Sequence, residues 1–277
     1  MTDILDDLVT MSSHNLVSNK SSRSLLGKLG HAAGLLIIMR PFMDPLWAAW
    51  SAPFPEVHPG CIWTKQIQTE LTWFLVFFRG QGTTVERFFT LDAYNRTGTI
   101  VEIGTDASPW GLGGWLAING TITQYFSSAL SAFDTTKFGI QIGDTNGQQL
   151  WEALAVLVVV DLWSAHWHQQ RIVLKVRSDN VTALTLLTKM RPPSPSIAVV
   201  ARELAMRLVH LSFPPDAEHT PGVGHVLADK LSRVYAPVPR WKGDVGSTGV
   251  LEDISHPALP SAQEAQAPAR DDTWHRV

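Results

Sequence analysis

The clearest pattern along the chain is an alternation of apolar residues that runs into an aspartate. Residues 100–106 read Ile-Val-Glu-Ile-Gly-Thr-Asp, and small residues and glycines dominate 107–114. Such an alternation, rich in β-branched residues, predicts a strand. Aspartate is common where a strand opens into a turn, so we expect this strand to end at Asp106.

The next residues predict a hairpin. Residues 114–118 and 121–126 flank the dipeptide Asn119-Gly120. This dipeptide favours a type I′ turn, because both central residues of that turn need a positive φ. Three strands should therefore form an antiparallel meander, and the polar residues 127–147 should form a long connection after it.

Helical and strand-like patterns alternate beyond this connection. Residues 148–166 predict a helix that is buried on most sides at its middle, and 172–178 predict a strand that ends at Asp179. Later segments predict three helices and one short strand, namely helices over 181–189, 197–211 and 226–234 and a strand within 211–218. The order βββαβααβα predicts an α/β fold, a sheet covered by helices.

The two ends of the chain follow other patterns. Residues 1–97 are expected to be mainly helical, with apolar residues at helical spacing over 25–36 and 67–78. After residue 235, prolines, small residues and charges follow no period, which predicts a disordered tail over 236–277. The α/β domain is therefore expected to span 98–235.

Composition narrows the cellular setting. The chain has 277 residues, 45% of them hydrophobic, a net charge of −3 and one cysteine, Cys61. A single cysteine cannot form an internal disulfide, and no secretory signal is visible, so we expect an intracellular protein, cytoplasmic or nuclear. The longest apolar runs are too short to span a bilayer, so no membrane partner is expected.

Four carboxylates fall at comparable places in the predicted elements. Asp106 and Asp179 end two strands, and Glu152 and Asp229 lie in the first turns of two helices. In open sheets, ligands gather at the carboxyl ends of strands. Clustered carboxylates repel each other unless a cation lies among them, and hard oxygen ligands suit Mg²⁺ or Mn²⁺. Two such ions about 4 Å apart can hold the attacking and leaving oxygens of a phosphodiester.

Each of these residues also has a plain structural explanation. Glu152 is compatible with a first-turn helix acid, Asp179 with a strand-to-helix turn, and Asp229 with an i,i+4 pair to Arg233. His219 precedes Asp229 in a loop that we expect to lie over the carboxylates. There it could move a proton or help to release a product, whereas a solvated loop histidine is the alternative.

Four pieces of the sequence match a known family in order and spacing: 105–108, Glu152, 178–180 and 219–233. Together they resemble the ribonuclease H domain of retroelement reverse transcriptases, across roughly residues 98–235. The resemblance implies a ribonuclease H-like five-stranded mixed sheet, with three antiparallel strands and then two parallel ones, flanked by helices. It also implies endonucleolytic hydrolysis of the RNA strand of an RNA–DNA hybrid.

The resemblance further implies roles for single residues. Asp106, Glu152, Asp179 and Asp229 would hold two Mg²⁺ ions, with Mn²⁺ as a substitute, and Asp106 would bridge them. His219 would be the mobile loop histidine. The implied nucleic-acid partner is an RNA–DNA hybrid, bound with little sequence specificity.

A weaker resemblance to the same retroelement proteins extends toward the N-terminus. Residues 24–50 and 62–79 look like the thumb and connection that follow a polymerase palm, so other parts of a retroelement polyprotein are expected partners. The polymerase catalytic motifs are missing, and no DNA synthesis is expected. His225 stands where the family usually has Asn, which puts the geometry of that loop in question.

Two other readings compete with a nuclease. The missing palm and His225 favour a catalytically decayed nucleic-acid-binding or structural remnant of the polyprotein. An integrase or transposase is disfavoured, because those enzymes place a glutamate last among the catalytic acids, whereas Asp229 is last here. The candidate phosphate contacts are the basic residues of the later elements, Lys175, Arg177, Lys189, Arg191, Arg202 and Arg207.

Overall fold

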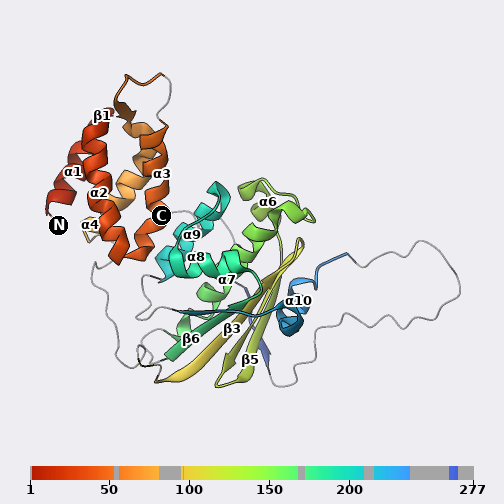
Figure 1. Ribbon diagram of the computed structural model, residues 1–277. Helices are drawn as coiled ribbons and strands as arrows, with labels where there is room; N and C mark the ends of the chain where they lie inside the picture. Colours follow the sequence, from red (N-terminus) through yellow and green to blue (C-terminus); the bar gives the residue numbers. More distant parts are fainter. Residues whose placement is uncertain are drawn as a thin grey trace, which may run out of the picture. The chain divides into compact units, whose positions relative to one another are not determined.

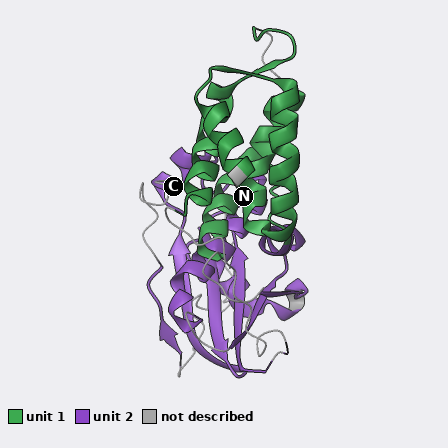
Figure 2. Cartoon of the chain, turned by 90° about the vertical axis from the view of Figure 1, so that its left-hand side faces the viewer, with its two compact units in different colours: residues 1–88, 189–212, 277 green, residues 89–188, 213–276 purple. Residues whose placement is uncertain are grey.

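The computed structural model describes residues 2–52, 56–80, 95, 97–167, 172–208, 215–237 and 262–267. The chain divides into two compact units, coloured separately in Figure 2. The first consists of residues 1–88 and 189–212 with residue 277, and the second of residues 89–188 and 213–276.

The first unit is mainly helical, which confirms the prediction for the N-terminal segment. Its helices are α1 (Thr2–Ser12), α2 (Asn19–Leu35), α3 (Arg40–Ser51), α4 (Gln68–Phe78) and α9 (Pro195–Leu208), with 3-10 turns η1 (Ile37–Met39) and η2 (Thr64–Ile67). Two short antiparallel strands, β1 (Leu16–Ser18) and β2 (Cys61–Trp63), add a small sheet that the sequence pattern did not predict.

Helix α9 is part of the first unit, and an ion pair connects it to α4. Arg202 of α9 donates from Nη2 to Glu70 Oε1 at 2.7 Å and from Nε to the carbonyl of Pro41 at 3.4 Å. Glu70 is only 5% exposed, so this partner stabilises a buried charge. The division into compact units thus places α9 in the mainly helical unit. The domain boundaries predicted from the sequence, 1–97, 98–235 and 236–277, stay a proposal.

The second unit is built on one mixed sheet with the strand order β7-β6-β3-β4-β5-β8. Its strands are β3 (Thr99–Ala107), β4 (Gly111–Ile118), β5 (Thr121–Ala129), β6 (Ile172–Ser178), β7 (Asp216–His219) and β8 (Gln263–Glu264). Strands β3, β4 and β5 are antiparallel, β6 runs parallel to β3, and β7 runs parallel to β6. The predicted arrangement, three antiparallel strands and then two parallel ones, is confirmed.

The hairpin between β4 and β5 has the predicted turn. Asn119 has a φ of 50° and Gly120 a φ of 82°, so both central residues adopt the left-handed region that a type I′ turn requires. Glycine carries no penalty there, and asparagine is one of the few other residues that tolerate it.

Helices cover both faces of the sheet (Figure 1). They are α6 (Ala132–Phe138), α7 (Gln148–Leu162), α8 (Val181–Lys189) and α10 (Val226–Ser232), with 3-10 turns η3 (Thr145–Gly147), η4 (Ser164–His166) and η5 (Gly222–Gly224). Two neighbouring glycines of β4 show which helix lies on which face. A Cβ atom on Gly114 would lie 3.0 Å from Val159 of α7, and one on Gly113 would lie 2.3 Å from the backbone nitrogen of Ser232 of α10. Since successive strand residues face opposite sides, α7 and α10 pack on opposite faces.

Two predictions of secondary structure are wrong in part, and others fall on residues that the structure does not describe. The stretch 127–147 is not an irregular connection throughout, because Ser131 and Asp134 form a capping box that starts α6. Within the tail predicted to be disordered, residues 262–267 are described, and Gln263–Glu264 of them form β8, a sixth strand beside β5. Residues 238–261 and 268–277 of that tail, and 211–214 of the predicted last strand, lie outside the described residues. None of the described helices is long and apolar enough to cross a bilayer.

Candidate active site

Asp106 lies near the end of β3, opposite Gly113 of β4, and is 4% exposed. A buried carboxylate needs hydrogen bonds to offset the loss of water. The hydroxyl of Ser232 supplies one, since its Oγ lies 2.7 Å from Asp106 Oδ2. The glycine at position 113 allows this contact, because any side chain there would collide with the end of α10.

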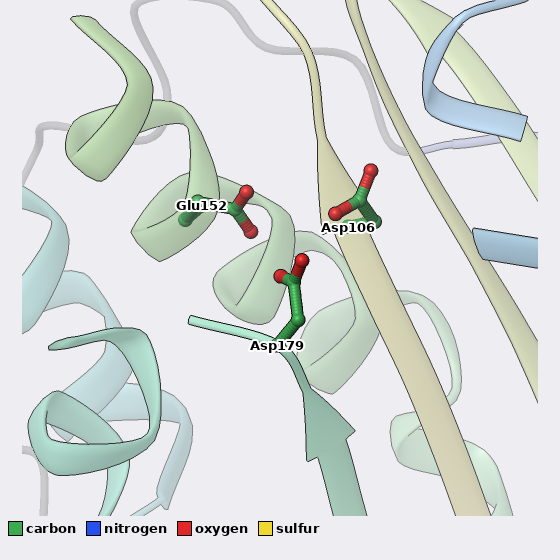
Figure 3. A group of neighbouring side chains, drawn as sticks. All are labelled: Asp106, Glu152 and Asp179. Carbon is green, nitrogen blue, oxygen red and sulfur yellow. The ribbon is translucent and has the colours of Figure 1, made fainter. Parts of the chain in front are cut away.

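Glu152 lies in the second turn of α7 and is 3% exposed. Gln148, the first residue of that helix, donates from Nε2 to Glu152 Oε1 at 2.8 Å. The other carboxylate oxygen, Oε2, is buried and has no hydrogen-bond partner. Figure 3 shows the Glu152 carboxyl group directed toward Asp106 and Asp179.

Asp179 directly follows β6 and is exposed. Because β6 runs parallel to β3, the carboxyl ends of the two strands lie at the same edge of the sheet, as the sequence predicts. The next residue, Asn180, accepts a hydrogen bond from the backbone nitrogen of Ala183 at 3.0 Å, so it caps the N-terminus of α8.

These three carboxylates form one cluster. Asp106, Glu152 and Asp179 each offer an oxygen atom, and the three atoms lie within 4.8 Å of one another. Among the residues that the structure describes, no other group of three or more acidic, histidine or cysteine side chains is placed in this way. Oxygen ligands of one Mg²⁺ are separated by at most about 4.2 Å, twice the usual metal–oxygen distance of about 2.1 Å. The cluster could therefore hold a divalent cation after small side-chain adjustments, with the unpartnered Glu152 Oε2 available as a ligand atom.

The electrostatics of the cluster point the same way. Burial raises the pKa of Asp106 from 3.8 to about 6, with further increases from the charges of Asp179 and Asp229, while the Ser232 hydrogen bond opposes the shift. Burial and the neighbouring Asp106 raise the pKa of Glu152 well above its ordinary value. Such shifts show that the protein alone does not compensate these negative charges, whereas bound cations would.

Asp229, the fourth predicted acid, lies outside this cluster. Its Oδ1 accepts a hydrogen bond from Arg233 Nε at 2.6 Å, and both side chains are about half exposed (43% and 55%). This is the i,i+4 pair with Arg233 that the sequence indicates as the structural explanation of Asp229. The charge of Asp229 nevertheless contributes to the raised pKa of Asp106.

The two histidines near the predicted site have different surroundings. His219 is exposed at the end of β7, and its Nε2 lies 3.1 Å from the backbone carbonyl of Asp179. His225 is 3% exposed, and its Nε2 lies 2.8 Å from the carbonyl of Thr105. Because a carbonyl only accepts, Nε2 of His225 carries the proton. His225 does not cap α10 with its side chain, but it fastens the start of α10 to the strand that carries Asp106.

Two residues that contact the carboxylates were not found from the sequence. Gln148 precedes Glu152 by one helical turn, and Ser232 follows Asp229 by three residues on α10. The spacing of four residues places Gln148 and Glu152 on the same helix face, so it was a usable signal for that contact. The contact of Ser232 is with Asp106 on β3, and it depends on which side of α10 faces the sheet.

Most of the candidate phosphate contacts have acidic neighbours. Lys175 and Arg177 lie 3.7 and 3.5 Å from the carboxylate of Glu102, and Arg202 is paired with Glu70. These three basic side chains thus have acidic partners within the fold, and contacts with nucleic acid stay a prediction.

Comparisons with known proteins give weak structural matches only. No protein-family model matches the chain, and no curated protein matches it. RNase H1 from the halophilic archaeon Halobacterium salinarum NRC-1 is similar at 16% identity and a TM-score of 0.32, over 48% of this chain and 92% of that one. Two structures of a foamy viral protease-reverse transcriptase with double-stranded DNA match at 15% and 16% identity and TM-scores of 0.27 and 0.25. They cover 75% and 70% of this chain, and 38% and 40% of the viral chains.

Proposed function

We propose that this protein is a metal-dependent ribonuclease H that cleaves the RNA strand of RNA–DNA hybrids. The observation that carries the proposal is the convergence of Asp106, Glu152 and Asp179 at one edge of the sheet, although they come from segments far apart in the sequence. The burial of one unpartnered carboxylate oxygen supports a cation at this place. The order and spacing of the motifs support hydrolysis of a hybrid rather than another metal-dependent reaction.

In this proposal the four acids have distinct tasks. Asp106 and Glu152 form the buried side of the site, and Asp179 forms its solvent-facing side, where a phosphodiester could approach. Asp229 of α10 would be the fourth ligand. For this, its side chain would have to leave Arg233 and turn toward the other three carboxylates. Two Mg²⁺ ions, or Mn²⁺ in their place, would supply activation of the attacking water and stabilisation of the leaving oxygen.

His219 has a further place in the proposal. Its side chain is exposed to solvent and lies beside the backbone of Asp179. We assign it to proton movement or product release rather than to holding the ions.

The wider context is part of the same proposal. The chain would be the ribonuclease H part of a retrotransposon reverse transcriptase, working inside the cell together with other parts of the polyprotein. A hybrid would be recognised by its groove shape and its 2′-hydroxyl groups, so little sequence preference is expected.

The decisive experiment is hydrolysis of an end-labelled RNA–DNA hybrid by the full chain. We expect cleavage of the RNA strand in Mg²⁺ or Mn²⁺, no cleavage in EDTA, and none by the Asp106→Asn variant. Single-stranded RNA and a DNA duplex are the substrate controls. A folded chain that cleaves no hybrid with either metal would overturn the proposal.

A decayed remnant is the second candidate, and one observation favours it. Asp229 is held by Arg233 at 2.6 Å and does not join the other three carboxylates. If this arrangement persists, the site has lost one ligand. Hybrid binding that does not respond to Mg²⁺, without turnover, would support this candidate.

A further inference from the structure

Through a single amide group, Gln148 connects the buried carboxylate of Glu152 to the end of the strand that carries Asp106. Its Nε2 donates to the carbonyl of Ala107 at 2.6 Å and to Glu152 Oε1 at 2.8 Å. A primary amide nitrogen carries two hydrogens, so both donors are used. The side chain is partly buried, which protects these contacts from competition by water.

The two acceptors belong to different elements. Ala107 follows Asp106 on β3, and Glu152 lies one turn after Gln148 on α7. The amide therefore ties the end of the strand to the first turns of the helix at the level of the two carboxylates. It also decides which oxygen of Glu152 is used, because Oε1 has a donor while Oε2 is buried without one.

The chemical type of the residue matters as well. A lysine or arginine could satisfy the same oxygen, but its charge would cancel the negative charge that attracts a cation. A neutral amide fixes the carboxylate and leaves that charge in place. Partners of this kind, one shell outside a metal, orient the ligand and are needed for tight binding.

We infer that Gln148 is a positioning residue, which holds Glu152 so that its Oε2 joins Asp106 and Asp179 in binding a divalent cation. The inference rests on the metal site of the proposed function. Gln148 touches none of the reacting atoms in this arrangement, and its effect passes through Glu152. Two other roles are distinguishable, namely a direct contact with the nucleic acid and a general contribution to folding.

The first experiment measures metal binding without nucleic acid. Mn²⁺ binding by the full chain is followed by electron paramagnetic resonance for the unchanged protein, Gln148→Met and Gln148→Leu. Methionine has a similar length and a good helix propensity but donates no hydrogen bond. We expect the Mn²⁺ affinity of both variants to fall by roughly 10- to 100-fold. Gln141→Leu, at an exposed glutamine before the helix, is the control and should bind like the unchanged chain.

The second experiment asks whether the effect passes through Glu152. In a Glu152→Gln background, Gln148→Met should change the Mn²⁺ affinity by less than about twofold, because the carboxylate that Gln148 positions is gone. In cleavage assays, Gln148→Met should raise the Mg²⁺ concentration for half-maximal activity and leave the KM for the hybrid unchanged. Circular dichroism should show the same fold, with a melting temperature lowered only as far as the loss of two hydrogen bonds requires.

Several outcomes would overturn the inference. Unchanged Mn²⁺ affinity in the folded Met and Leu variants would remove it while leaving the proposed function intact. An effect of the same size in the Glu152→Gln background would show a general structural role, and a raised KM with normal Mn²⁺ binding would show a nucleic-acid contact. If the unchanged chain binds no Mn²⁺, the metal site of the proposed function fails, and this inference fails with it.

Discussion

Two helices of the second unit bring an acid to the same edge of the sheet, and they do so in different ways. Helix α7 is buried along almost its whole length, from Leu150 to Val160, and holds Glu152 out of water with one oxygen unpartnered. Helix α10 has seven residues and presents Asp229 half-exposed in a pair with Arg233. The difference shows that position along the chain predicts where an acid lies but not how tightly it is held.

The two helices also affect the cluster differently. Helix α7 contributes Glu152, whose pKa is raised by burial and by the charge of Asp106. Helix α10 acts on Asp106 in two opposing ways, because the hydrogen bond from Ser232 lowers its pKa and the charge of Asp229 raises it. In the metal-free protein, α7 therefore adds a second buried carboxylate to the cluster, whereas α10 both relieves and adds to the electrostatic strain on Asp106.

The largest effect is expected for Glu152→Gln on α7. The substitution keeps the size of the side chain but removes the charge, so hybrid cleavage in Mg²⁺ should fall by more than the roughly 10- to 100-fold typical of residues one shell outside a metal. The metal-free variant should also melt at a higher temperature, because a buried and repelled carboxylate has been removed.

Cleavage rates and thermal melting in EDTA measure both effects, and Asp161→Asn at the other end of α7 is the control. If Glu152→Gln cleaves the hybrid at a normal rate, α7 does not provide a metal ligand. The burial of Glu152 would then have no functional consequence that distinguishes α7 from α10.

The next prediction concerns pH. Asp106 has a pKa of about 6 in the folded chain against 3.8 as its ordinary value, so the folded state binds more protons than the unfolded state between these values. The free energy of unfolding of the metal-free protein should therefore rise as pH falls from 7 to 5, by ~1.3 kcal/mol for this group, and approach its limit of ~3 kcal/mol only below pH 3.8. The raised pKa of Glu152 acts in the same direction.

Urea denaturation at several pH values, with EDTA and with Mg²⁺, measures this dependence. Mg²⁺ should stabilise the protein more at pH 7 than at pH 5, because protonated carboxyls bind it poorly. A stability of the metal-free chain that increases from pH 5 to pH 7 would contradict the raised pKa values.

The sheet and the position of the three clustered acids were predictable because short-range patterns specify them. Alternation gave β3, the Asn119-Gly120 dipeptide gave the β4–β5 turn, and a strand followed by Asp179 gave the second acid. Such signals depend on residues close together in the chain. They were sufficient because parallel pairing of β3 and β6 then forces the strand ends together.

The parts that escaped prediction depend on contacts between distant segments. The pairing of β8 with β5 joins residues more than a hundred positions apart, and two residues carry no periodicity. The partner of Asp229 was open between a cation and Arg233, because both explanations fit the same spacing. The contact of Ser232 with Asp106 needed the packing of α10 on Gly113, which no local pattern reveals.

A smaller effect is expected for Asp229→Asn on α10. If Asp229 completes the metal site, cleavage should fall about tenfold or more and higher Mg²⁺ should restore part of it. Loss of the exposed pair with Arg233 should cost at most about 1 kcal/mol of stability. Arg233→Gln is the informative partner variant, because it frees Asp229 and should keep or increase activity. Unchanged cleavage by Asp229→Asn would leave α10 with a supporting role only.

The smallest effect is expected for Ser232→Ala, and α10 offers a matched control. The hydroxyl of Ser232 donates to Asp106 at 2.7 Å, whereas the hydroxyl of Ser127 on β5 donates to the carbonyl of Leu231, at the same end of α10, at 2.8 Å. Each alanine variant should lose about 1 kcal/mol of stability with one hydrogen bond. Only Ser232→Ala should also change cleavage, by a few-fold and more strongly at limiting Mg²⁺, because only this hydroxyl touches a proposed metal ligand. Equal activity of the two variants would mean that α10 supports the site through its packing on the sheet, and that its contact with Asp106 has no separate role.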